Sequence, residues 1–223
     1  ALNMSSALAN RFCHLEIEAD TPTWIRWALE QGLHPAVVGF LRFAPQRLFD
    51  MSGDVERGWP SPRSWERVAW ALSSAEGQGP AGPGLDDASL RLVLQGLVGV
   101  GAATEFLAYR SWASKLPDVL ALLRREDLGG VELPTRADQR FALCAAAVHH
   151  AHRHDELMPG LLRLSQRLPS DFAVMCLVDY LEAAGPGIEE RARRVFGEPL
   201  FRQGWAEHHG EVFRARFALR ARG

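Results

Sequence analysis

The chain has 223 residues, of which 47% are hydrophobic, so it is long enough for one large domain or two small ones. Its formal net charge is −2, which does not indicate a general attraction to nucleic acids or membranes. No apolar run reaches the roughly 20 residues that a membrane span needs, and the first residues lack the pattern of a signal peptide. Three widely spaced cysteines form no disulfide framework, so a reduced, cytoplasmic setting is expected.

The first 20 residues carry the only strand-like pattern. Residues 12–18, FCHLEIE, alternate apolar and polar side chains, which predicts a half-buried β-strand. A single strand cannot satisfy its own hydrogen bonds, so its partners would have to come from elsewhere. The segment has no start methionine at position 1, and we expect the chain to be a piece of a longer protein.

Helical signals follow, beginning at Asp20. Asp20-Thr21-Pro22, His34-Pro35 and Ser61-Pro62 each read as a cap followed by proline in the first turn. Glycine and proline dominate residues 77–84, which predicts a flexible connection. Two further helices are expected, one capped by Asp86 and one over residues 102–113.

A second helical block is expected after residue 115. Its predicted helices cover residues 117–125, a long segment capped by Thr135, residues 157–168, a segment capped by Ser170-Asp171, residues 188–196, 200–208 and a tail from Glu211. No fixed period indicates a solenoid repeat. The fold class predicted is therefore all-α, with one orphan strand before the first helical bundle and a second helical domain after it.

Two arginines stand beside expected element boundaries. Arg11 precedes the predicted strand, and Arg63 lies in the first turn of the helix that follows Ser61-Pro62. A cation at a helix N-terminus is electrostatically misplaced unless an anion lies nearby, and a phosphate would supply that anion. From spacing alone, both are more simply read as surface arginines.

The order and spacing of four segments carry a resemblance: ALANRFCHLEI at 7–17, WIRWA at 24–28, HPAVVGFL at 34–41 and PSPRSWERV at 60–68. Together they resemble the C-terminal part of a bacterial MoxR-type AAA+ ATPase. The resemblance covers about residues 1–112. It implies a remnant of the AAA+ core over 1–20, a helical lid over 21–114 and a C-terminal helical domain over 115–223.

The same resemblance implies roles for single residues. Arg11 would be an arginine finger that acts in trans on a neighbouring subunit, and Arg63 would be the sensor 2 residue that contacts ATP phosphate in cis. Trp59, close to Arg63 in the sequence, is the candidate for a contact with adenine. The resemblance further implies ATP and Mg²⁺ in the intact protein, a homo-oligomeric ring, and a partner with a von Willebrand factor A-like domain.

The chain departs from that family because it has no Walker A or Walker B motif. Lys115 is the only lysine, and no glycine run precedes it. We therefore expect this chain alone to hold no cofactor and hydrolyse no ATP. The alternative is a stand-alone all-helical adaptor that binds a protein partner and no nucleotide.

Two further patterns in the sequence do not indicate a binding site. The histidine-rich segment HHAHRHDE at 149–156 has i, i+4 spacing, but no third ligand is identifiable and we expect no metal site. The tail FRARFALRAR at 213–222 interleaves aromatic residues with arginines, but nucleic acid is not expected as a partner of a net-acidic chain.

Overall fold

The computed structural model describes residues 10–15, 18–52, 57–77, 85–113 and 115–220, with the side chains of 217–220 left aside. Within these ranges the fold is all-α, as the sequence predicts, and no strand is present. The α-helices are α2 (Thr21–Glu30), α3 (Pro35–Phe43), α4 (Pro62–Ala75), α5 (Asp87–Ala113), α6 (Val119–Arg124), α7 (Ala137–Arg153), α8 (Met158–Gln166), α9 (Ser170–Glu182), α10 (Ile188–Gly197) and α11 (Ala206–Arg220). The shorter turns are η1 (Pro45–Arg47), η2 (Asp155–Leu157), η3 (Gly185–Gly187) and the π-helical η4 (Phe201–Trp205).

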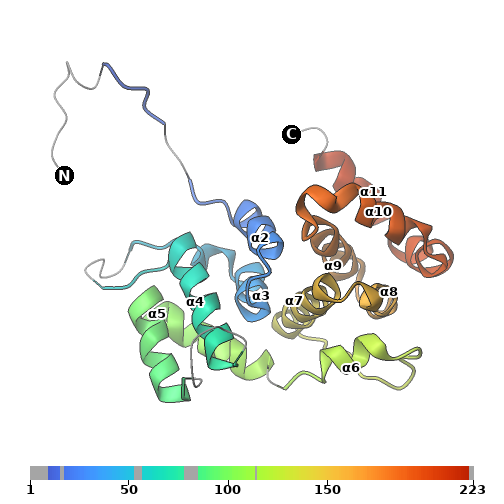
Figure 1. Ribbon diagram of the computed structural model, residues 1–223, viewed down its shortest axis with the longest axis horizontal. Coiled ribbons are helices and arrows are strands. Elements are labelled where there is room, and N and C mark those ends of the chain that lie inside the picture. The colour runs from blue at the N-terminus through green and yellow to red at the C-terminus, as the bar shows by residue number, and fades with distance from the viewer. Residues whose placement is uncertain (1–9, 16–17, 53–56, 78–84, 114, 221–223) are drawn as a thin grey trace.

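The helices form one body with α4 and α5 at one end, α10 and α11 at the other, and α3, α7 and α9 between them (Figure 1). Helix α3 packs along α7, and α7 packs along α9. One hydrophobic cluster contains buried side chains from Trp24 to Trp205 and so spans both expected helical domains. The boundary between residues 114 and 115 remains a prediction.

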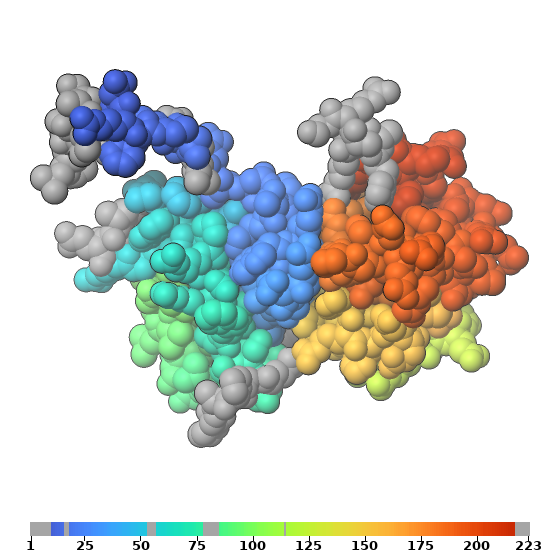
Figure 2. Space-filling view, turned by 45° about the horizontal axis from the view of Figure 1, so that its top comes forward, coloured from blue at the N-terminus to red at the C-terminus, as the bar shows by residue number. Residues whose placement is uncertain are grey.

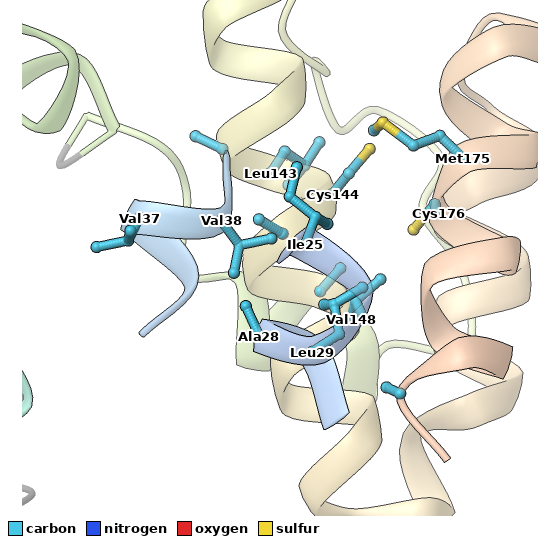
Figure 3. Packing of buried hydrophobic residues seen from close by; sticks show 14 of the residues in the cluster. Ile25, Ala28, Leu29, Val37, Val38, Leu143, Cys144, Val148, Met175 and Cys176 are labelled. Carbon is cyan, nitrogen blue, oxygen red and sulfur yellow. The ribbon is translucent and has the colours of Figure 1, made fainter. Parts of the chain in front are cut away.

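The centre of this body is a junction of four helices (Figure 3). Ile25, Ala28 and Leu29 of α2 and Val38 of α3 lie against α7. Leu143, Cys144 and Val148 of α7, with Met175 and Cys176 of α9, complete the junction. Burial of these side chains contributes on the order of 1.5–3 kcal/mol for each large aliphatic residue, so this contact holds the two halves of the chain together.

Gly39 permits the closest approach of α3 to its neighbours. A Cβ atom built there would lie 2.5 Å from the Tyr109 hydroxyl oxygen and 3.2 Å from the Phe141 carbonyl oxygen. Both distances are shorter than ordinary van der Waals contact, so a side chain at residue 39 would push α3 away from α5 and α7.

A buried ion pair also joins α3 to α9. The Arg42 guanidinium donates a hydrogen bond to the Asp179 carboxylate, and the two side chains are 14% and 5% exposed. Burial raises the pKa of Asp179 to about 6, although the neighbouring Arg42 charge acts in the opposite direction. The Arg42 Nε atom is buried and has no hydrogen-bond partner. This pair is therefore a costly group of charges at the centre of the fold.

The two helices expected over residues 86–113 are the two arms of α5. The backbone of α5 leaves helical geometry at Gly99, where φ is +78°, and this kink separates the two arms. By its length and a mean hydropathy of 1.4 over an 18-residue stretch, α5 could cross a membrane, a test that core helices of soluble proteins also pass. Leu90, Leu94 and Phe106 of α5 are buried in the body, and the structure is compatible with a soluble protein.

The predicted strand over residues 12–18 is not formed in residues 12–15 and 18, while residues 16–17 lie outside the described ranges. Phe12 and Leu15 are 57% and 78% exposed, and their segment projects away from the helices (Figure 2). The physical reason is the absence of a partner strand among the described residues, since alternation alone cannot satisfy the backbone hydrogen bonds.

The predicted helix caps are right at four sites and wrong at two. The side chains of Asp20, His34, Ser61 and Asp86 accept hydrogen bonds from the backbone N–H groups of Thr23, Ala36, Ser64 and Ser89. Thr135 is not a cap, because α7 begins one residue later, after Arg136. Ser170-Asp171 is not a cap either, because Ser170 is already helical and α9 begins after Pro169.

Candidate functional site

The N-terminus of α4 is well ordered by local hydrogen bonds. The Ser61 Oγ atom accepts from the Ser64 backbone N–H at 3.1 Å, and Pro62 occupies the first turn. The Ser64 hydroxyl in turn donates to the carbonyl oxygen of Trp59 at 3.0 Å. These bonds fix the first turn of α4 and therefore the point from which the Arg63 side chain extends.

Arg63 is exposed and forms no hydrogen bond or ion pair with any described residue. Arg67 and Trp70, one and two turns further along α4, share its outward face, because residues spaced by four and seven lie on one side of a helix. Trp70 is 56% exposed, which is unusual for so large an aromatic side chain. This face therefore offers two guanidinium groups and an indole ring to whatever lies outside the chain.

Trp59 is half-buried and lies edge-on against Phe49, with ring centroids 5.3 Å apart. The structure thus brings Trp59 to the base of α4, next to Arg63, as its place in the sequence suggests. Its ring packs within the chain, and the contact with adenine stays a prediction.

Arg11 is exposed on the segment of residues 10–15, which lies apart from the helices (Figure 2). It forms no hydrogen bond or ion pair with any residue in the described ranges. Arg11 and Arg63 are therefore not held together by a contact within the chain. An arginine that acts on a neighbouring subunit would need no such contact.

The histidines of residues 149–156 point to different partners. Burial lowers the pKa of His149 to about 4, and His152 Nδ1 lies 3.1 Å from the Arg191 guanidinium. His154 lies 3.5 Å from Glu156 at the surface. Within the part of the chain that the structure describes, no three His, Cys, Asp or Glu side chains converge to hold a metal ion. Of these side chains, His152 joins α7 to α10 through Arg191.

A cavity of about 570 Å³ lies elsewhere, and sequence reasoning missed it. Its walls come from the start of α3, the end of α4, both arms of α5, the segment before α6, and α7. The charged or polar lining residues are His34, Glu76, Asp87, Arg91, Arg110 and Ser111. A volume in this range is typical of small-molecule sites.

His34, Glu76 and Arg110 form a hydrogen-bonded group at this cavity. The His34 Nδ1 atom accepts from the Ala36 backbone N–H at 3.2 Å, so the proton of the neutral ring is on Nε2, which donates to Glu76 at 3.0 Å. Arg110 donates to the other Glu76 oxygen at 3.0 Å. The His34 hydrogen bond and then the Arg110 contact lower the pKa of Glu76 to about 2, so Glu76 stays ionised at neutral pH.

No signal in the sequence could have found this group, because Glu76 lies 42 residues from His34 and 34 residues from Arg110. In the sequence, His34 is recognisable only as the cap of the helix that begins at Pro35. Comparisons of the chain with models of protein families, with curated proteins and with solved structures find no match.

Proposed function

We propose that the chain is the C-terminal part of a MoxR-type AAA+ ATPase that couples ATP hydrolysis to protein remodelling. In this proposal α2–α5 form the lid and α6–α11 the helical domain that follows it. Arg63 is the sensor 2 residue and Arg11 the arginine finger. The intact protein would use ATP and Mg²⁺, assemble as a homo-oligomeric ring in the cytoplasm, and act on or with a partner that has a von Willebrand factor A-like domain.

The observation that carries the proposal is the environment of the Arg63 side chain. Its guanidinium is exposed, has no counterion among the described residues, and stands in the first turn of a helix whose N-terminus is capped by Ser61. The positive end of a helix attracts phosphate. Phosphate would also supply the negative charge that Arg63 lacks, and a planar guanidinium can bind two phosphate oxygens at once.

The proposed mechanism joins chemistry to motion. Binding of ATP would draw the α4 N-terminus toward the γ-phosphate through Arg63, and α2–α5 would move with it. Arg11 of the neighbouring subunit would complete the site and stabilise the charge of the transition state. Hydrolysis would release both arginines from the γ-phosphate. The loss of these contacts would displace the helical body, and in this way hydrolysis would drive motion.

The first test is the coding sequence of the complete gene. The proposal expects a further domain-sized region of roughly 150–200 residues before Ala1, with Walker A and Walker B motifs. A gene without such a region would contradict the proposal.

The second test uses three variants of the full-length protein. Arg63→Ala should weaken ATP binding at least about tenfold, which is the loss expected for a charge-assisted hydrogen bond. Arg67→Ala is the matched control, since it removes the same charge one turn further along the same helix face, and should leave binding within about twofold. Arg11→Ala should reduce turnover by about 10³ or more while ATP binding is unchanged. Equal binding by the Arg63→Ala and Arg67→Ala variants would refute the sensor 2 assignment.

The second candidate function is a helical adaptor that binds a protein partner without nucleotide. The exposed indole of Trp70, on the same face of α4 as Arg63 and Arg67, favours it, because tryptophan and arginine dominate the binding energy of many protein interfaces. Under this reading Trp70→Ala would abolish partner binding, and the gene would encode no P-loop.

A further inference from the structure

The cavity at His34 is separate from the α4 N-terminus, and the proposed function does not use it. Most of its wall is apolar: Pro35, Leu90, Leu107, Leu116, Ala142 and Ala146. Its volume is about 570 Å³, inside the range of sites that enclose a small molecule. The lining thus combines an apolar chamber with a few charged groups, as ligand sites in proteins do.

The charged side chains that line the cavity differ in how many hydrogen bonds they can still form with a ligand. Both oxygens of Glu76 are occupied, one by His34 and the other by Arg110. Arg110 uses only one of its nitrogen atoms, Nη2, for that bond. Arg91 is exposed and has no ion pair with a described residue, although Asp87 stands one turn before it on α5. Two guanidinium groups therefore keep hydrogen-bond donors to spare.

We propose that this cavity binds a small amphipathic carboxylate. The apolar part of the ligand lies against Leu90, Leu107 and Ala146, and its carboxylate accepts hydrogen bonds from Arg91 and from the remaining N–H groups of Arg110. A guanidinium presents parallel donors that match the two oxygens of a carboxylate. A cationic ligand is disfavoured, because both Glu76 oxygens already accept hydrogen bonds and the two guanidinium groups of Arg91 and Arg110 outnumber the one unpaired carboxylate of the lining, Asp87.

Decanoate is the probe, and decanol is its uncharged counterpart with the same chain length. Isothermal titration calorimetry of the 223-residue chain should show saturable binding of one decanoate per chain. Decanol should bind at least about tenfold more weakly, because it cannot form the charge-assisted bonds. Equal affinity for the two probes, or no saturable binding of decanoate at millimolar concentration, would overturn the proposal.

Variants locate the site. Arg91→Gln removes the positive charge and keeps a polar side chain, and it should weaken decanoate binding at least about tenfold, while binding of decanol stays unchanged. Arg67→Gln on α4 is the matched control and should bind decanoate like the wild type. Ala146→Leu fills the chamber without a change of charge and should weaken both probes. Decanoate binding that is insensitive to both Arg91→Gln and Ala146→Leu would contradict the assignment.

Circular dichroism of each variant decides whether it is folded. Should Arg91→Gln fail to fold, the comparison of decanoate with decanol on the wild type and the Ala146→Leu variant still decides the proposal. These measurements need neither ATP nor an upstream domain, so their failure is distinct from failure of the ATPase proposal.

Discussion

The Arg42–Asp179 pair makes the sharpest prediction about stability. It lies where α3 meets α9, with side chains 14% and 5% exposed, and it links residues 137 positions apart. Burial raises the pKa of Asp179 from 3.8 to about 6. Each pKa unit corresponds to about 1.36 kcal/mol, so ionising Asp179 in the folded protein costs on the order of 3 kcal/mol more than in the unfolded chain.

Three variants separate the free-energy cost of burying the two charges from the stabilisation that their pairing provides. Asp179→Leu should destabilise the fold by about 3–5 kcal/mol, because Arg42 is left buried and its Nε already lacks a partner. Arg42→Met should cost less, because Asp179 can take up a proton. The double variant should lie within about 1 kcal/mol of the wild type or exceed it, since apolar residues of similar volume replace both charges.

The assay is urea denaturation followed by circular dichroism. At pH 7 the four proteins form a double-mutant cycle. The folded state with the raised pKa binds a proton more readily between about pH 3.8 and 6, so the contribution of Asp179 to stability falls as pH rises through that window. The double variant has no carboxylate at residue 179, so its stability should not show the pH dependence that Asp179 contributes in this window. Additive effects of the two single variants, or a loss below about 1 kcal/mol for Asp179→Leu, would refute the reasoning.

Two further predictions concern the packing around α3. Glu76→Gln should lower stability at pH 7 by about 1–2 kcal/mol, a value reduced from the full pKa shift because the Glu76 side chain is 35% exposed. That contribution is present above about pH 4.5 and is lost as pH falls toward 2. In urea denaturation, the difference in unfolding free energy between the wild type and Glu76→Gln should therefore be smaller at pH 3 than at pH 7. An equal difference at the two pH values would contradict the prediction. Gly39→Ala should cost about 1–3 kcal/mol because its Cβ atom would meet the Tyr109 hydroxyl at 2.5 Å, and Tyr109→Phe should restore part of the loss in a thermal melt. No rescue by Tyr109→Phe would show that the contact with the hydroxyl is not the cause.

Local features of the fold were predictable from the sequence. Asp20, Ser61 and Asp86 cap their helices because a cap needs only a side-chain oxygen and the N–H groups of the next turn. Thr135 and Ser170 meet the same local criterion, yet the helices begin elsewhere. Sequence preference at a helix end is a weak term that packing of the whole helix can outweigh.

Features that depend on distant residues were not predictable. The strand over 12–18 required a partner strand, and alternation in one segment cannot report whether such a partner exists. The Arg42–Asp179 pair and the group of His34, Glu76 and Arg110 each join residues at least 34 positions apart. The path of α3 brings Arg42 to Asp179 and His34 to Glu76, and the packing of α4 against α5 brings Glu76 to Arg110.

The most direct test of the central claim is the affinity of the full-length protein for ATP, measured by calorimetry for the wild type, Arg63→Ala and Arg67→Ala. We predict that Arg63→Ala weakens binding at least about tenfold while Arg67→Ala stays within about twofold of the wild type. Wild-type affinity in the Arg63→Ala variant would contradict the claim that this arginine contacts the nucleotide.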